Sequence, residues 1–160
     1  MSDTHVLSER AVEAERVKTP KARVLVMEDE PPVVYVINEA LGELGCTVDA
    51  ASNGEEALRM VGENIYDVIL LNIERPWLRG DALYEEIERW KPALSERVAF
   101  ISGDTEKVET SAFLEGAGRP YLWKPFSIRD LQKMVIRVMQ EKDGETMPNM
   151  GEDGLQVALS

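Results

Sequence analysis

Several features that define other classes of protein are scarce in this sequence. Its 160 residues include a single cysteine, Cys46, which excludes an internal disulfide framework. No stretch approaches the roughly 18 consecutive apolar residues of a membrane span, and residues 1–20 lack the apolar run of a secretion signal. These absences predict a reduced, cytoplasmic protein in which Cys46 packs as a small apolar side chain.

Basic residues are also in short supply. Eighteen lysines and arginines face thirty acidic residues, so the formal net charge is -12 at pH 7. Such a charge repels nucleic acid phosphates and anionic membrane surfaces, and we therefore expect partners that are proteins or cations. The only histidine, His5, has no second candidate ligand beside it, so we predict no metal role for it.

The two ends of the chain differ from its middle. Residues 1–22 are mostly polar, and residues 143–160 combine Gly, Pro, Asn and acidic residues without periodicity. We predict a flexible N-terminal arm over 1–22, one folded domain over 23–142 and a flexible acidic tail over 143–160. The tail is too short for a DNA-binding or catalytic output domain, so we expect any output to pass through surface contacts.

In the middle of the chain, apolar β-type runs alternate five times with amphipathic stretches. This alternation predicts an α/β domain, a doubly wound parallel sheet of five strands with helices on both faces. The predicted strands are 24–27, 47–51, 68–71, 98–101 and 121–123, and the predicted helices are 32–44, 54–63, 81–90, 105–115 and 127–140.

Polar residues gather where these strands end, and ligands of doubly wound sheets bind at that edge. Taken singly, each group has an ordinary explanation: a solvated acidic loop, a helix cap, or a turn with or without a cis peptide bond. Independent loops would not be expected to place carboxylates, a hydroxyl and a lysine at successive strand ends, so we interpret them as one site. The groups are Glu28-Asp29-Glu30, Asn72, Ser102-Gly103-Asp104 and Lys124-Pro125-Phe126.

These segments carry a resemblance that spans residues 22–142. The chain resembles a response-regulator receiver domain of two-component signalling, and its last two matching segments are most similar to receivers of hybrid sensor kinases. The resemblance implies a flavodoxin-like (βα)5 fold with strand order 2-1-3-4-5, and a signalling module rather than an enzyme. The matching segments are RVLVMEDEPPV, ASNGEEALRMV, YDVILLNIERPWLRG, VAFISGD and RPYLWKPF.

The resemblance also implies roles for particular residues. Glu28 and Asp29 would be the acidic pair that binds Mg²⁺. Ser102 would hydrogen-bond a phosphoryl oxygen, and Lys124 would contact the same group. Tyr121 would be the aromatic residue whose rotamer follows phosphorylation. Independently of the family, a cation held by carboxylates, an ammonium and a hydroxyl donor suit the negative charge of phosphoryl transfer.

Asn72 departs from the family pattern, because it stands where the phosphoacceptor aspartate is implied. The lone pair of an amide nitrogen is delocalised and an amide oxygen lacks the full charge of a carboxylate, so Asn72 is not expected to accept a phosphoryl group. The missing carboxylate predicts weak or absent Mg²⁺ binding by Glu28, Asp29, Asn72 and the backbone carbonyl of Glu74. It also lowers like-charge repulsion, which favours the unphosphorylated fold.

Other departures are weaker. Glu28 replaces the more usual first aspartate, and Arg75 stands where a methionine is common; we expect Arg75 to lie in solvent. Trp77 lies in the same loop. The sequence leaves open whether Trp77 is an exposed anchor for a partner or packs over the rim of the site.

Three functions compete. We favour a stand-alone pseudo-receiver that docks a histidine kinase, a phosphotransfer protein or a downstream target without being phosphorylated. The second is a phosphoacceptor regulator whose aspartate was changed to asparagine to hold it inactive. The third is a flavodoxin-like nucleotide-binding enzyme. That enzyme needs a phosphate-cradling glycine loop after the first strand, where this sequence has acidic residues and prolines.

The resemblance marks residues 105–140 as the face used for targets and for a possible homodimer. Apolar residues on this face belong either to the core or to a docking surface. Phe113 and Leu114 are the candidates whose exposure decides between the two.

Overall fold

The computed structural model of the protein describes residues 22–74, 77–103 and 108–142. Predictions that fall on the other residues, including those for His5, Arg75, Asp104 and the two chain ends, lie outside the described ranges. Ala22 is buried and its carbonyl accepts a hydrogen bond from the Thr47 N–H, so the folded unit includes this residue of the predicted arm.

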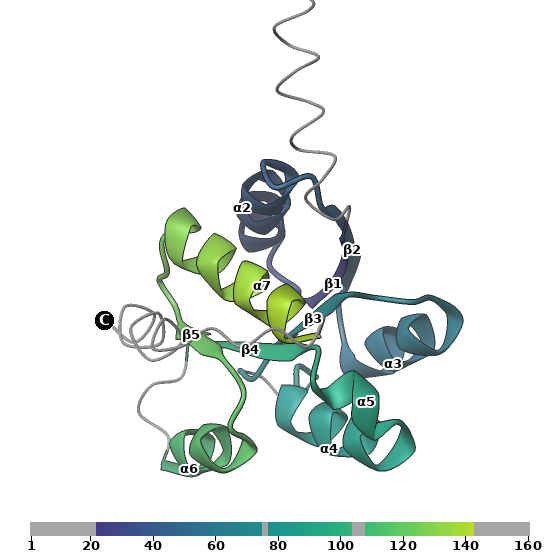
Figure 1. The fold of residues 1–160 in the computed structure, drawn as a ribbon. Helices are drawn as coiled ribbons and strands as arrows, with labels where there is room; N and C mark the ends of the chain where they lie inside the picture. Colours follow the sequence, from purple (N-terminus) through teal and green to yellow (C-terminus); the bar gives the residue numbers. More distant parts are fainter. Residues whose placement is uncertain (1–21, 75–76, 104–107, 143–160) are drawn as a thin grey trace, which may run out of the picture.

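Five parallel strands form one sheet in the order β2-β1-β3-β4-β5 (Figure 1). All residues of β3 and β4 are buried, because helices cover both faces of the sheet, and this explains their continuous apolar runs. The predicted fold class and strand order are confirmed. The strands are β1 (Arg23–Met27), β2 (Thr47–Ala51), β3 (Val68–Asn72), β4 (Val98–Ser102) and β5 (Tyr121–Trp123).

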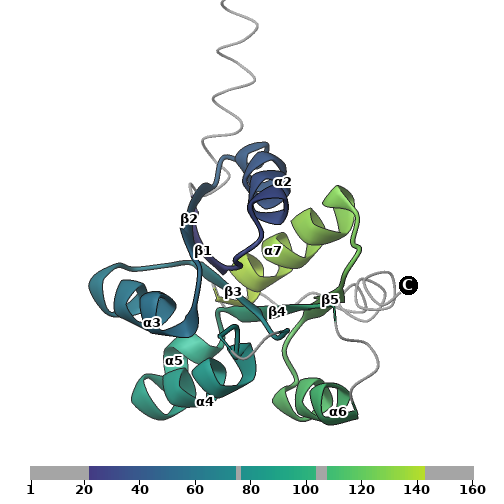
Figure 2. The ribbon, with the colours of Figure 1, turned by 180° about the vertical axis from the view of Figure 1, so that it is seen from behind.

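Helices α2 and α7 lie on one face of the sheet, and α3, α4 and α6 lie on the other (Figures 1 and 2). Within the described ranges, no helix combines the length and the apolar character that crossing a bilayer requires. The helices are α2 (Pro31–Gly42), α3 (Gly54–Glu63), α4 (Gly80–Trp90), α5 (Pro92–Ser95), α6 (Val108–Ala117) and α7 (Ile128–Lys142).

The short helix α5 was not predicted. Pro92 has no N–H to continue the hydrogen bonding of α4, so α4 ends at Trp90 and a new turn starts with the proline in its first position. The other helices begin and end within a few residues of their predicted limits. The first residues predicted for α6 lie in 104–107, outside the description.

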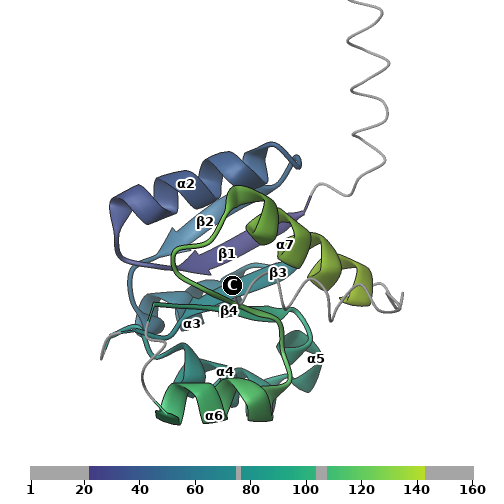
Figure 3. The same cartoon turned by 90° about the vertical axis from the view of Figure 1, so that its left-hand side faces the viewer.

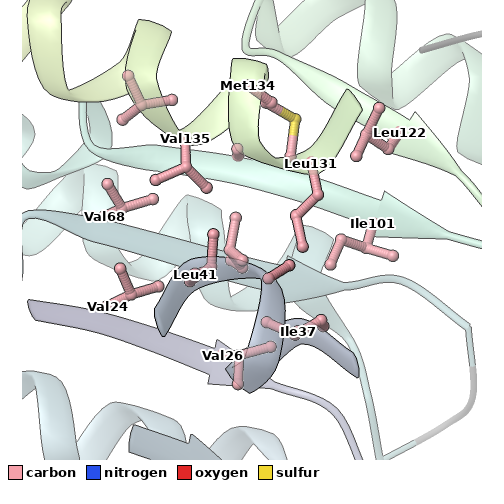
Figure 4. Close-up of a cluster of buried hydrophobic side chains, with 14 of the residues drawn as sticks. Val24, Val26, Ile37, Leu41, Val68, Ile101, Leu122, Leu131, Met134 and Val135 are labelled. Carbon is pink, nitrogen blue, oxygen red and sulfur yellow. The ribbon is translucent and has the colours of Figure 1, made fainter. Parts of the chain in front are cut away.

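The core has two layers, one on each face of the sheet. Alternate residues along a strand point to opposite faces, so Val24 and Val26 pack toward α2 and α7, whereas Leu25 and Met27 pack toward α3 and α4. Figure 4 shows the first layer, where strand side chains meet those of both helices. Its labelled members are Val24, Val26, Val68, Ile101 and Leu122 from the strands, and Ile37, Leu41, Leu131, Met134 and Val135 from the helices.

The candidate docking residues of α6 belong to the second layer. Leu114 is 1% exposed. The Phe113 ring meets the rings of Phe100 and Tyr84 edge to face, with centroids 5.3 and 6.0 Å apart. Leu114 is therefore a core residue, and the partly buried Phe113 packs against the same layer, so both side chains anchor α6 to the sheet.

Cys46 is only partly buried, at the margin of the layer beneath α2 and α7. Burial, and then the negative charge of Asp67, raise the pKa of its thiol. The side chain therefore stays a neutral thiol near pH 7, in agreement with its predicted apolar role.

Candidate functional site

The site lies at the carboxyl edge of the sheet, beside the point where the strand order reverses. β1 and β3 are neighbours, but the chain leaves β1 toward α2 on one face and β3 toward α4 on the other. Figure 3 shows this edge from the side, with the strands running in one direction. Diverging connections leave room for polar side chains between them, which is where doubly wound proteins place their ligands.

Glu28 is the centre of the site and is only 2% exposed. Its Oε1 lies 2.8 Å from Lys124 Nζ and accepts a hydrogen bond of 2.6 Å from Asn72 Nδ2. Its Oε2 accepts a hydrogen bond of 3.1 Å from the Glu30 N–H. One buried carboxylate therefore joins the chain segments that follow β1, β3 and β5, and each of its oxygens has a polar partner.

Lys124 neutralises part of the charge of the acidic groups. Besides Glu28, its ammonium pairs with Glu74 Oε1 at 3.1 Å and lies 3.9 Å from Glu30 Oε2. Burial by itself would lower the pKa of Lys124, but the Glu28 and Glu74 carboxylates outweigh burial, so the net pKa lies above its ordinary value. Lys124 is therefore fully charged at neutral pH.

The Glu74 side chain was missed by the sequence analysis, which assigned only its backbone carbonyl to the site. Its carboxylate lies so close to Gly103 that a Cβ there would stand 2.9 Å from Glu74 Oε1. A glycine directly after β4 thus leaves room for this carboxylate beside Lys124. The feature of the sequence that could have indicated this side chain is its position, since an acidic residue only two positions beyond Asn72 lies close to the same edge of the sheet.

Asn72 ends β3 with its side chain fully buried. Its amide nitrogen donates to Glu28, but Oδ1 has no hydrogen-bond partner among the residues that the structure describes. A buried amide oxygen without a partner is uncommon and is a suitable ligand for a hard cation. Glu28, Asp29 and Glu30 can also bring one oxygen each to within 4.8 Å of one another. The oxygen donors therefore fit Mg²⁺, although Lys124 already neutralises part of their charge.

Trp77 is attached to the rim of the site. Its indole Nε1–H donates a hydrogen bond of 2.6 Å to Asp29 Oδ2, and its side chain is 51% exposed. The structure thus combines features of both alternatives, because the indole N–H binds the rim of the site and the residue is exposed, as an anchor for a partner requires. The hydrogen bond joins residues 48 positions apart, and no local pattern in the sequence indicated it.

Ser102 and Tyr121 lie on the two strands beyond Asn72. Ser102 is 1% exposed, and its Oγ donates to the carbonyl of Ile73 at 2.9 Å, next to Asn72. Tyr121 is partly buried, and its ring meets Trp123 edge to face with centroids 5.7 Å apart. Burial, and then the charge of Glu115, raise the pKa of Tyr121. The implied switch roles of Ser102 and Tyr121 stay predictions.

With this geometry established, comparison with known proteins identifies the family. A family model described as the response regulator receiver domain matches residues 24–136. The chain belongs to this family, whose members are receiver modules of two-component signalling and interact with histidine kinases or phosphotransfer proteins and with downstream targets.

Several curated relatives contain a similar segment. The transcriptional regulatory protein TcrA of Mycobacterium tuberculosis is 31% identical over 112 residues, which are 68% of this chain and 42% of TcrA. The DNA-binding transcriptional regulator NtrC of Escherichia coli is 30% identical over 78% of this chain and 26% of its own length. The sensor histidine kinase GacS of Pseudomonas protegens is 27% identical over 80% of this chain and 14% of GacS. The chain thus spans less than half of each of these relatives.

Solved structures show the same fold. The response regulator TrrA of Thermotoga maritima, in complex with Mg²⁺-BeF, is 29% identical with a TM-score of 0.63, over 73% of this chain and 98% of TrrA. A CheY-like receiver domain protein of Methanospirillum hungatei has a TM-score of 0.69 at 24% identity, over 78% of this chain and 98% of its own. These similarities bear out the implied fold, and they do not favour a nucleotide-binding enzyme.

Proposed function

We propose that this receiver signals without phosphorylation at Asn72, by docking a histidine kinase, a phosphotransfer protein or a downstream target in the cytoplasm. One observation carries the proposal: the side chain at the phosphoacceptor position is a fully buried amide that donates a 2.6 Å hydrogen bond to Glu28. In this orientation the amide nitrogen stabilises the acidic pocket. It offers no nucleophilic oxygen with a full negative charge.

The charges around Asn72 support the same conclusion. The Lys124 ammonium already pairs with Glu28 at 2.8 Å and with Glu74 at 3.1 Å. The acidic groups therefore have an internal counter-ion, which neutralises part of their charge when no cation is bound. In a phosphorylated receiver, the family resemblance implies that Lys124 and Ser102 would contact the phosphoryl oxygens instead.

We propose weak Mg²⁺ binding at the same place. Glu28, Asp29, Asn72 Oδ1 and the backbone carbonyl of Glu74 would hold the ion, which would supply positive charge to the carboxylates. Both oxygens of Glu28 already have partners within 3.1 Å. A cation would have to compete with these donors, which lowers its affinity.

We also propose that residues 105–140 form the docking face, for a target or for a second copy of this chain. Since Leu114 is buried and Phe113 packs against the core, the exposed side chains of this face are the candidates for the contact. Val108 is 78% exposed and Ile128 is 45% exposed, and they are the large apolar side chains that the described part of this face presents to solvent.

Treatment with a small phosphodonor tests the proposal. After incubation with acetyl phosphate and Mg²⁺, the intact mass of the protein should be unchanged, whereas Asn72→Asp should gain one phosphoryl group. Asn64→Asp is the matched control, because it adds the same carboxylate before β3, at the opposite end of the sheet, and should stay unlabelled.

Two results would contradict the proposal. A phosphoryl adduct on the unchanged protein would show that another residue or chemistry accepts the group. An Asn72→Asp variant that folds and stays unlabelled would show that Asp29, Ser102 and Lys124 do not form a phosphoryl-transfer site.

A further inference from the structure

Trp77 is held by two other loops of the carboxyl edge. Its indole N–H donates to Asp29 Oδ2 at 2.6 Å, in the segment after β1. Its backbone carbonyl accepts a hydrogen bond of 3.2 Å from the N–H of Gly54, at the start of α3. The indole is therefore placed at the carboxylate by contacts from both sides, although Trp77 as a whole is 51% exposed.

Asp29 is accessible to ions as well as to the indole. With Glu28 it lines one end of an open groove of about 560 Å³ between α2 and β2. A divalent cation entering there would bind the Asp29 carboxylate. An indole N–H is a donor only and carries a partial positive charge, so it cannot ligate a cation and repels one that approaches the same oxygen.

We propose that Trp77 competes with a divalent cation for Asp29. Without a cation, the indole is hydrogen-bonded to Asp29 Oδ2; when a cation binds the carboxylate, this hydrogen bond breaks and the ring moves. Because the ring is already half exposed, its release changes the surface beside the site. This inference deepens the proposed weak cation binding and rests on the site assigned there.

Substitution of the indole tests the competition. Trp77→Phe keeps an aromatic ring but removes the N–H donor. Isothermal titration with Mg²⁺, and with Mn²⁺ as a second probe, should show roughly threefold to tenfold tighter binding by this variant, the range given by one hydrogen bond of ordinary net strength. Trp90→Phe is the matched control, because Trp90 is 49% exposed and lies at the end of α4, and it should bind like the unchanged protein.

The indole N–H resonance gives a second readout that does not depend on affinity. In ¹H–¹⁵N spectra, the signal that disappears in Trp77→Phe belongs to Trp77. Asp29→Ala should shift this signal and speed its exchange with solvent, and Mg²⁺ should shift it in the unchanged protein while the Trp90 signal stays in place.

Three results would overturn the inference: equal or weaker cation binding by Trp77→Phe, an indole signal indifferent to Asp29→Ala, or no Mg²⁺ binding by either protein at millimolar concentration. The last result would also remove the proposed cation site. It would leave the proposal of phosphorylation-independent signalling standing, since the mass measurement on Asn72 tests that separately. If Trp77→Phe bound Mg²⁺ and the unchanged protein did not, the result would support the competition, because the indole would then exclude the cation completely.

Discussion

Near each end of the sheet an acidic side chain is held by a cation and by a second hydrogen-bond donor, but the two differ in how far they are buried. Near the amino end, Arg23 of β1 and Tyr66 donate to Asp49, which lies in the middle of β2, at 3.0 Å from Arg23 Nε and 2.8 Å from the Tyr66 hydroxyl. At the carboxyl end, Glu28 is bound by Lys124 and Asn72 at similar distances. The side chains of Arg23 and Asp49 are 44% and 25% exposed, whereas that of Glu28 is completely buried.

This difference in burial decides how much stability is lost when one partner of each cluster is removed. Water screens an exposed ion pair, so losing one partner costs little. A buried carboxylate cannot be rehydrated, so its partners are obligatory. The buried acidic cluster therefore depends on its partners for its stability, whereas the amino end is an exposed tie between neighbouring strands.

The largest expected effect on stability comes from removing the cation at the buried end, and the same change at the amino end gives its comparison. Lys124→Met leaves Glu28 buried without its ion-pair partner and should lower the free energy of unfolding by about 3 kcal/mol. Arg23→Met breaks the exposed pair and should lower it by less than about 1 kcal/mol. Urea unfolding followed by circular dichroism measures both. Equal losses would mean that the two ends do not differ in the way that burial predicts.

Asn72→Asp sharpens the comparison at the buried end. The change replaces a donor 2.6 Å from Glu28 Oε1 by a second carboxylate, so the free energy of unfolding in EDTA should fall by about 1–3 kcal/mol. Mg²⁺ at about 100 times its dissociation constant should restore about 2.7 kcal/mol. Asn38→Asp, at an exposed position of α2, is the control and should change stability by no more than about 0.5 kcal/mol. A variant that is more stable in EDTA than the unchanged protein would contradict this view of the pocket.

Tyr66→Phe tests a hydrogen bond at the amino end and should lower the free energy of unfolding by about 1 kcal/mol near pH 7. Burial, and then the hydrogen bond to Asp49, raise the pKa of Tyr66 to about 12. Because the folded pKa is above the unfolded value of about 10, this stabilisation is present below pH 10 and is lost as the pH rises from 10 to 12.

The stability difference between the unchanged protein and Tyr66→Phe should therefore shrink as the pH rises from 10 to 12 in a series of urea titrations. Tyr35→Phe, whose ring is 65% exposed, should show no such dependence. A difference for Tyr66→Phe that is constant over this range would show that the hydroxyl does not titrate differently in the folded state.

Much of the fold could be predicted because its pattern is local. Buried strands covered on both faces have to be apolar along their length, as Val68–Leu71 of β3 is, and amphipathic helices repeat their apolar residues every three or four positions. The short helix α5 was missed because its four residues are too few for any period to show. Glu28, Asn72 and Lys124 could be assigned to one site because parallel strands end at the same edge.

The sequence by itself determined the order of strands and helices, the positions at the strand ends, and the amide of Asn72 at the end of β3. Only the tertiary structure decided which side chains meet there. Lys124 pairs with Glu28 and Glu74, Trp77 donates to Asp29, and Phe113 turns inward to the rings of the core. The physical reason is distance along the chain: these partners come from separate loops and helices, and packing of the whole sheet and its helices brings them within contact.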